Sequence, residues 1–329
     1  MKTTLNRIDA FVILVILILL IGILSTYFNW GWVSVVFSIT LPLLFIVNVL
    51  VGIYGAFKRK YFCLIGAVCY LLIFHVIYTF SNASTYKSID DIRILSFNTR
   101  GFSYNYNGEN TRPNLIRFID TLQADIVVLQ ESNFPITRKF QDYPYNFNDL
   151  RLKKGKSLLS IYSKYPIVHS GYIDFPNTRN NAIYTDIVVH NDTIRLYNVH
   201  LQSHQLNKSA LQIDNDTYKN LFQKVSHTFQ IQVEQSEMIR NHRDSTSYKT
   251  ILCGDFNTPQ YALPYRILKQ DLSDSFLEKG HGLGTTYNLK GFPLRLDYIL
   301  TDQSIEILNH ENFNVNLSDH EPVLVTIKL

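Results

Sequence analysis

Three long runs without Asp, Glu, Lys or Arg occupy most of the first 80 positions, and they constrain this chain more than any other feature. The runs cover residues 10–28, 32–57 and 61–80. A helix needs about 20 apolar residues to cross the hydrocarbon core of a bilayer. Only helices and closed barrels satisfy their backbone hydrogen bonds there. We therefore expect three transmembrane helices and assign residues 1–80 to a membrane region.

The basic residues around these runs predict their orientation. Lys2 and Arg7 precede the first run, the segment KRK at 58–60 separates the second from the third, and the uncharged link FNWGW joins the first two. Positive residues stay on the cytoplasmic side, so the N-terminus is expected in the cytoplasm and residues 81 onward in the periplasm or at the cell exterior. A cleaved signal peptide has a similar start, but two further apolar runs follow here. We expect a multi-pass protein of the cell (inner) membrane.

The net charge of the chain is concentrated in this membrane region. After residue 80 the chain carries 26 of its 31 basic and 26 of its 27 acidic residues, so that part is neutral. Proteins that grip nucleic acid without sequence specificity usually present a basic surface. The neutral charge of this part makes non-specific binding of nucleic acid a weaker prediction, but it does not exclude a local basic groove. The three cysteines, two of them in the third apolar run, indicate no disulfide framework.

After a polar linker at 81–91, short apolar runs alternate with longer polar segments. Runs rich in Ile, Val, Leu and Tyr and bounded by Gly, Pro, Asn or Asp are typical of strands. They lie at 92–98, 124–131, 157–163, 182–190, 193–201, 250–257, 294–300 and 322–329. Residues 114–122 and 218–243 are expected to be helical, the second with an apolar face that should pack on a sheet. Mixed strands and helices favour an α/β sandwich over an all-β barrel.

Polar side chains lie at the ends of several of these strands. In chain order they are Asn98, Glu131, His200, Asp255, Asn257, Asp297, Asp319 and His320. Open α/β sheets build their sites at such strand ends. Each residue alone has a plainer interpretation, as a turn former, an exposed strand end or a surface ion-pair partner. Their recurrence in one chain favours a common site.

The chemistry of this set is that of a cation site beside imidazoles. Carboxylates and an amide oxygen, from Glu131, Asp319, Asp297 or Asp255, and Asn98, are hard donors that suit Mg²⁺ or Mn²⁺ rather than zinc. His200 and His320 can supply protons or bind a phosphate oxygen. Oxygen ligands with imidazoles fit metal-assisted attack of water on a phosphate ester.

The ordered motifs LSFN, LQE, NVHLQS, GDFN, RLDYIL and SDHEPV resemble those of the endonuclease/exonuclease/phosphatase superfamily. The resemblance spans residues 92–329 and leaves the apolar runs uncovered. It implies a four-layer α/β sandwich in which two mixed sheets are flanked by helices. His200 in NVHL resembles the deoxyribonuclease I-like and neutral sphingomyelinase-like branch, whereas abasic-site endonucleases place a Tyr-x-Pro-Asn type segment there. Tyr287 stands where relatives often have Trp, which alters the expected pocket wall.

The resemblance also implies roles for the polar residues. Glu131 would be the principal metal ligand, with Asn98 and Asp319 beside it. His320 would pair with Asp297 and act as a general base or stabilise the phosphate. The remaining positions are Asp255, which would position the attacking water or the leaving group, Asn257, which would donate to a phosphate oxygen, and His200 and Arg179, which would contact the phosphate.

These observations predict a membrane-anchored, divalent-metal-dependent phosphoesterase with Mg²⁺ or Mn²⁺ as cofactor. Its substrate would be a phosphodiester from nucleic acid, a phospholipid head group or a small phosphate ester. Its partners would be that substrate and the bilayer, and no protein partner is predicted. The alternative is a membrane-bound binding domain that keeps the fold and lacks the chemistry.

Overall fold

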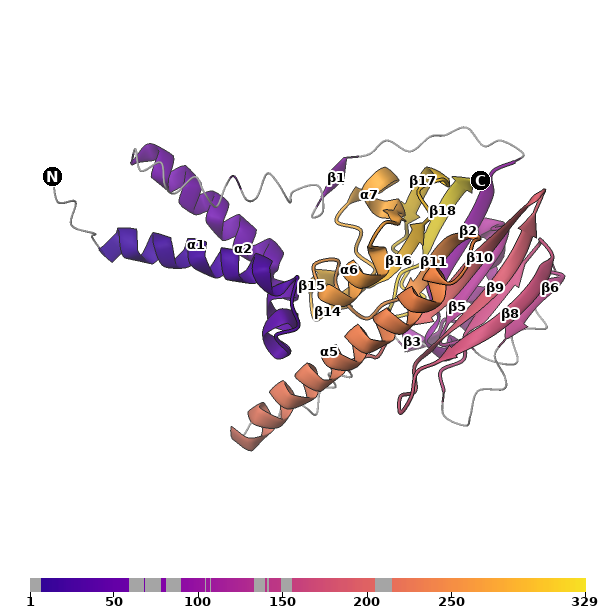
Figure 1. The fold of residues 1–329 in the computed structure, drawn as a ribbon, viewed down its shortest axis with the longest axis horizontal. Coiled ribbons are helices and arrows are strands. Elements are labelled where there is room, and N and C mark those ends of the chain that lie inside the picture. Colours follow the sequence, from indigo (N-terminus) through magenta and orange to yellow (C-terminus); the bar gives the residue numbers. More distant parts are fainter. Residues whose placement is uncertain are drawn as a thin grey trace.

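Two apolar helices extend from an α/β body in the computed structural model (Figure 1). The structure describes residues 7–58, 68, 78–80, 90–103, 105–106, 108–132, 140, 142–148, 156–204 and 215–329. Helices α1 (Arg7–Ser25) and α2 (Trp32–Phe57) match the first two predicted spans. The third span and the linker at 81–91 lie largely outside the described residues. Thr79–Phe80, predicted to end the third span, instead form strand β1, which pairs with β13 (His281–Gly282).

Two six-stranded sheets make up the body. The first has the order β17-β18-β2-β5-β7-β6, with bounds Glu306–Asn312, Val323–Lys328, Ile92–Asn98, Ile126–Gln130, Ser160–Ser163 and Tyr145–Asn148. The second has the order β12-β16-β11-β10-β9-β8, with bounds Ser273–Asp274, Asp297–Thr301, Lys249–Asp255, Asp192–His200, Asn181–Val189 and Ile167–Asp174. Both are mixed, because β2–β5 and β10–β11 are parallel and their other pairings are antiparallel.

Helices and short hairpins complete the fold. The helices are α4 (Arg112–Leu122), α5 (Asn215–Asp244), α6 (Leu263–Lys269), α7 (Ser275–Lys279) and the 3₁₀ turn η2 (Arg100–Phe102). The hairpins are β3–β4 (Asn105–Tyr106 and Glu109–Asn110) and β14–β15 (Tyr287–Leu289 and Phe292–Leu294). The predicted strand at 294–300 is thus split at Arg295 and Leu296, between β15 and β16.

The apolar faces of the two sheets pack against each other. Side chains alternate along a strand, so Ile92 and Ile94 of β2 and Ile194 and Leu196 of β10 enter one core between the sheets. Full burial of one such side chain contributes about 1.5–3 kcal/mol. Helix α4 covers the outer face of the first sheet, and α5 and α6 cover the second. The predicted four-layer α/β sandwich is confirmed.

Helix α5 corrects one expectation. Its apolar face was predicted to pack on a sheet, but within α5 the core over the second sheet includes Ile239, with Met238 packed against it, both near the C-terminal end. Val225 and Phe229 instead pack with Val35 of α2. The Trp32 backbone N–H also donates to Ser226 Oγ at 2.9 Å. The face of α5 therefore joins the apolar helices to the body, a contact that periodicity within one segment cannot reveal.

Candidate functional site

The topology brings the ends or starts of seven strands to one end of the sandwich. Parallel β2 and β5 end together, with Asn98 opposite Gln130, and parallel β10 and β11 end together, with His200 opposite Asp255. Antiparallel β16 starts where β11 ends, so Asp297 lies opposite Asp255. Antiparallel β18 starts beside the end of β2, which places Asp319 and His320 at the same end. β7 also begins there, with Ser160 opposite Leu129.

Directly below the site, the core between the two sheets contains buried polar side chains. Gln130 Nε2 donates to Asn198 Oδ1 at 2.8 Å, which joins the two sheets. Asn198 Nδ2 in turn donates to the Leu129 carbonyl at 2.9 Å. Buried polar groups need such partners. This bridge holds both sheets in register directly beneath the residues at their ends.

Asp297, His320 and Asp255 form a buried row. His320 Nδ1 lies 2.8 Å from Asp297 Oδ2, and its Nε2 lies 3.6 Å from Asp255 Oδ2. Burial alone would lower the pKa of His320, but the carboxylates of Asp297 and Asp255 outweigh it and raise the pKa to about 10. Burial raises the pKa of Asp255 to about 6, although His320 opposes that shift. This arrangement favours an imidazolium at His320 facing the site.

Asn98, Glu131 and His200 lie on the other side of Asp255. Asn98 Nδ2 donates to Asp255 Oδ2 at 2.9 Å and lies 3.4 Å from Glu131 Oε1. His200 Nε2 lies 3.7 Å from Asp255 Oδ2 and 3.8 Å from Glu131 Oε1. Burial lowers the pKa of His200, with Asp255 opposing it, which favours a neutral ring.

Two residues of the site have left-handed backbones. Glu131 has φ 45° and Asn257 has φ 49°, a region that residues other than glycine seldom adopt. The Glu131 carbonyl accepts from the Gly101 N–H at 2.6 Å, and Asn257 Nδ2 donates to the Leu201 carbonyl at 3.0 Å. These contacts hold the strained turns that follow β5 and β11. Such outliers cluster at functional sites.

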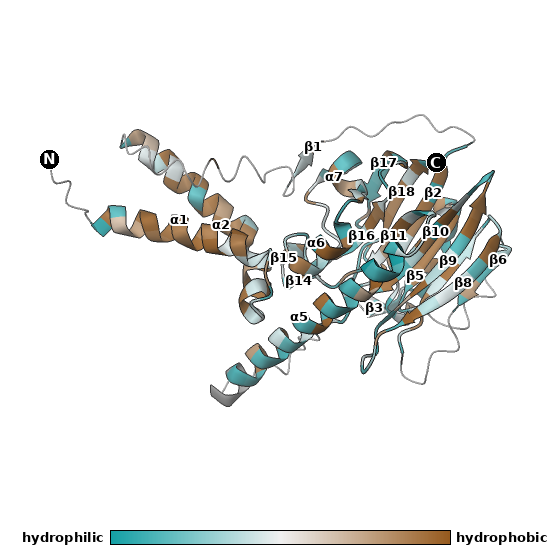
Figure 2. Cartoon of the chain, in the orientation of Figure 1, coloured by the Kyte–Doolittle hydropathy of each residue, from teal (hydrophilic) through white to brown (hydrophobic). Residues whose placement is uncertain are grey.

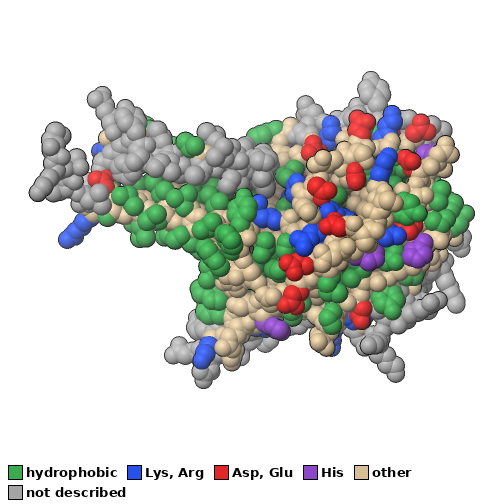
Figure 3. Space-filling view, viewed as in Figure 1, with side chains coloured by type: hydrophobic (Ala, Val, Ile, Leu, Met, Phe, Trp, Pro, Cys, Tyr) green, Lys and Arg blue, Asp and Glu red, His purple; other side chains and the backbone are tan. Residues whose placement is uncertain are grey.

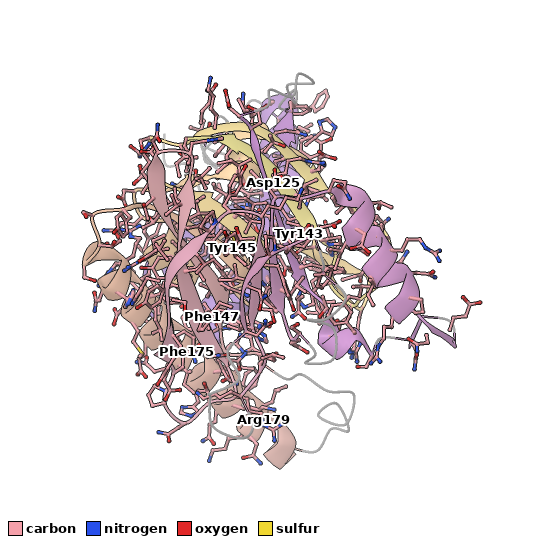
Figure 4. The ribbon with its side chains drawn as sticks, turned by 90° about the vertical axis from the view of Figure 1, so that its right-hand side faces the viewer. Asp125, Tyr143, Tyr145, Phe147, Phe175 and Arg179 are labelled. Carbon is pink, nitrogen blue, oxygen red and sulfur yellow. The ribbon has the colours of Figure 1, made fainter. Side chains whose placement is uncertain are left out.

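Asp319 and Arg179 lie farther from the centre than the other predicted residues. Asp319 forms an ion pair with Arg100 at 3.1 Å. Arg179 is exposed, and Figure 4 shows it beyond Phe175, at the opposite end of the body from Asp125. Asp125 precedes β5 whereas Glu131 follows it, so Arg179 lies at the end of the sandwich that holds the site.

Two hollows meet at Glu131 and Ser203. The first, here called the site pocket, has a volume of about 280 Å³. It is lined by Glu131, Asp255, Asn257, Asp319 and His320 together with Val35, Ser38, Ile39, Ser203, His204, Thr258, Pro259, Tyr287, Leu289, Leu294 and Leu296. The second, here called the basic pocket, is about 570 Å³ and includes His200, Arg100, Lys156 and Arg179.

Sequence reasoning missed part of the site-pocket wall. The α2 residues Val35, Ser38 and Ile39 lie in a run that was interpreted only as a membrane span, and nothing in the sequence marks them. His204, three residues after Leu201 at the end of NVHL, also lines the pocket, and its buried Nδ1 has no hydrogen-bond partner among the described residues. Proximity to the NVHLQS motif was the one signal that could have indicated His204.

The donor set fits a hard divalent cation. The Glu131 side chain is 42% exposed, and Asn98 Nδ2 is its nearest amide donor at 3.4 Å. The buried Asp297 Oδ1 has no partner in the described part of the chain. Ligand atoms of Asp255, Asp297 and His320 lie within 4.8 Å of one another. This trio differs from the expected ligands Glu131, Asn98 and Asp319. Asn98 directs its NH₂ group at the carboxylates of Asp255 and Glu131.

A two-sheet α/β sandwich with carboxylates, amides and imidazoles at one end defines the class of protein. The chain belongs to the Endonuclease/Exonuclease/phosphatase family, whose model matches residues 95–320. Members of this family are phosphoesterases and nucleases, so the chain has the fold of a hydrolase family. No protein with a curated description matches it.

Solved structures of similar fold include proteins with different substrates. D. rerio TDP2 complexed with single strand DNA product is 16% identical, with 73% of this chain and 99% of that chain covered and a TM-score of 0.54. The mannosyl-6-phosphatase of Bacteroides thetaiotaomicron is 17% identical, with 72% and 100% covered and a TM-score of 0.53. A family protein from the same bacterium is 17% identical, with 72% and 94% covered and a TM-score of 0.54. At these identities the likeness shows the fold alone.

Proposed function

We propose that this protein is a membrane-anchored, divalent-metal-dependent phosphoesterase that hydrolyses a phosphodiester. The observation that supports it most is the meeting of Glu131, Asp255 and His320 in one pocket, although they are separated by up to 189 positions in the chain. Mg²⁺ or Mn²⁺ bound at Glu131 would neutralise charge on the phosphate. Asn98 and Asp319 are the neighbouring candidates for the metal shell.

Hydrolysis needs two proton transfers, and different side chains of the site would carry them out. Water attacks phosphorus, a new P–O bond forms, and the bond to the leaving alcohol breaks. Asp255 holds the water and takes its proton. His320, fixed through Nδ1 by Asp297, directs Nε2 at the phosphate. The His320 imidazolium would deliver through Nε2 the proton that the leaving alcohol needs, while His200, which lies across Asp255, would contact the phosphate together with Asn257 and Arg179.

The exposed surface of α1 and α2 supports a membrane anchor. Both helices are long and apolar enough to cross a membrane. Figure 2 shows both helices largely hydrophobic along their length, and Figure 3 shows hydrophobic side chains on the surface of this part of the molecule. Phe11, Leu14, Ile46 and Leu50 are each more than half exposed. Apolar patches this extensive usually mark a binding surface, and a bilayer would cover them. The catalytic domain would then face the periplasm or the exterior.

The full chain in detergent or nanodiscs provides the test. We expect hydrolysis of bis-p-nitrophenyl phosphate that EDTA abolishes and Mg²⁺ or Mn²⁺ restores. Glu131→Gln and His320→Gln should each lower kcat by about 100-fold or more, whereas Glu306→Gln, an exposed residue of β17, should not. No hydrolysis with any divalent metal, or activity that survives both site variants, would contradict the proposal.

A further inference from the structure

Helix α2 forms part of the wall of the site pocket. Val35, Ser38 and Ile39 line the same hollow as Glu131 and His320. A helix that served only as a tether would not need to reach the site. Helix α5 holds α2 in this position, because Val35 packs against Phe229 of α5 and the Trp32 ring lies 4.7 Å from the ring of Phe222 of the same helix.

A second, apolar hollow continues from the site pocket along α2. This α2 groove has a volume of about 360 Å³ and shares Ser38, Ile39, Pro259 and Leu294 with the site pocket. Its far end is formed by Leu43 and Ile46 of α2 and by Phe292 and Leu283 of the body. Positions 39, 43 and 46 recur at i, i+4 and i+7, which places them on one face of the helix.

The groove leads away from the site toward the hydrocarbon region. α2 begins at Trp32, and Trp is typical of the membrane–water interface. From Val35 in the site pocket to Ile46 at the far end, the helix rises by about 16 Å at 1.5 Å per residue. This is about half the thickness of the hydrocarbon core. Leu43 and Ile46 are also open to their surroundings, with 52% and 55% exposure.

On the other side of Glu131, the basic pocket has the opposite character. Arg100, Lys156 and Arg179 line it together with Glu131; Arg100 is paired with Asp319 at 3.1 Å and Lys156 with Asp174 at 2.9 Å. The site therefore lies between an apolar groove that runs along α2 and a polar hollow lined by charged side chains. The molecule that matches this polarity is an amphiphile whose phosphodiester joins a hydrocarbon part to a polar head group.

We propose that the substrate is a lipid phosphodiester drawn from the bilayer, with its hydrocarbon chain in the α2 groove and its head group in the basic pocket. This rests on the proposed function and names its substrate class. Hydrolysis occurs at Glu131 and His320, between the two hollows. A nucleic acid has no hydrocarbon chain to occupy the groove, so its cleavage would not depend on Leu43 and Ile46.

Alkyl p-nitrophenyl phosphodiesters with chains from methyl to octyl test the groove directly, with the full chain in nanodiscs. We expect kcat/KM to rise by about tenfold or more along the series, because each buried methylene favours binding. Leu43→Trp and Ile46→Trp, which fill the groove, should remove this rise. Val47→Trp, on an exposed face outside the groove, should keep it and controls for partition into the nanodisc.

Phospholipid hydrolysis is then measured in proteoliposomes of phosphatidylethanolamine and phosphatidylglycerol, beside single-stranded DNA. Release of phospholipid products that Leu43→Trp abolishes and Val47→Trp preserves would support the proposal. Hydrolysis of the methyl ester without a chain-length effect, or cleavage of DNA alone, would overturn it and leave the proposed function standing. Failure to hydrolyse any ester would overturn both.

Discussion

Asp297 is the residue on which the orientation of His320 depends. Its Oδ2 holds His320 Nδ1 at 2.8 Å, and its backbone N–H donates to Thr286 Oγ1 at 3.1 Å. An imidazole bound through Nδ1 presents Nε2 to the pocket, and the bound partner thus selects which nitrogen can act. The ring of Tyr287 also lies against the His320 ring, with 4.8 Å between the ring centroids.

Asp297→Asn should therefore impair catalysis more than binding. The amide cannot stabilise the imidazolium and can present NH₂ to the ring, so kcat should fall by about 100- to 10,000-fold with little change in KM. Steady-state kinetics with bis-p-nitrophenyl phosphate measure both parameters. Asp192→Asn, an exposed position paired with Lys249, is the matched control. An unchanged kcat would show that Asp297 does not position His320.

At the scale of the element, the end of β11 depends on Gly254. Its φ is 137°, and a Cβ there would lie 2.0 Å from the Val199 carbonyl oxygen of neighbouring β10. No side chain fits at that distance. Glycine thus lets two parallel strands approach closely just before Asp255, and the motif GDFN combines this packing requirement with the site residues.

Gly254→Ala should destabilise the domain by about 3 kcal/mol or more, because strain in φ adds to the clash with β10. Gly291→Ala is the matched control, since Gly291 also has a positive φ, 90°, but nothing lies within 4 Å of its Cβ position. It should cost about 1 kcal/mol. Thermal unfolding in detergent compares the two. Equal shifts in midpoint would contradict the close approach of β10 and β11.

The contact between α7 and β17 predicts a pH dependence of stability. His310 Nδ1 lies 2.9 Å from Ser275 Oγ, and burial lowers the pKa of His310 from 6.5 to about 4. Between these values the unfolded chain binds the proton and the folded chain does not, so stability is lost as pH falls from 6.5 toward 4. One pKa unit corresponds to about 1.4 kcal/mol, so the free energy of unfolding falls by about 3 kcal/mol over this range.

His310→Gln should flatten this dependence. Glutamine can occupy the contact with Ser275 but cannot take up a proton, so the variant should be less stable near pH 7 and lose less stability on acidification. Thermal midpoints in detergent between pH 7 and pH 4.5 measure both slopes. Parallel slopes for the variant and the unsubstituted chain would show that His310 is not the titrating group.

Elements with a one-sided or continuous apolar pattern were predictable from the sequence, and those without it were not. β2 and β11 are buried along most of their length and were predicted within a residue or two. β8 was missed because four of its eight residues are exposed, and β17 because its sequence EILNHEN is mostly polar. The site residues were predictable because strand ends share an edge. The α2 wall was not, because it depends on packing between segments far apart in the chain.

At the scale of the whole molecule, the apolar helices and the body are fastened together. Arg266 of α6 lies 3.9 Å from the ring centroid of Tyr27 and donates to Thr26 Oγ1 at 3.1 Å. Leu41 and Phe45 of α2 pack with Tyr261 of the body. The contacts of Tyr27 and Thr26 lie at the link between α1 and α2, which the charge distribution predicts to lie outside the cell membrane. If that prediction holds, the body lies on the same side of the membrane as the link.

Cysteine labelling tests this orientation. In intact cells that express the chain, Ser304→Cys, in the exposed turn before β17, should react with a membrane-impermeant maleimide. Lys58→Cys, at the end of α2, should react only after the membrane is permeabilised, because positive residues remain in the cytoplasm. The unsubstituted chain sets the background from its own cysteines. Labelling of Lys58→Cys alone in intact cells would show that the topology is the reverse of the predicted one. The catalytic domain would then act on lipids of the cytoplasmic leaflet.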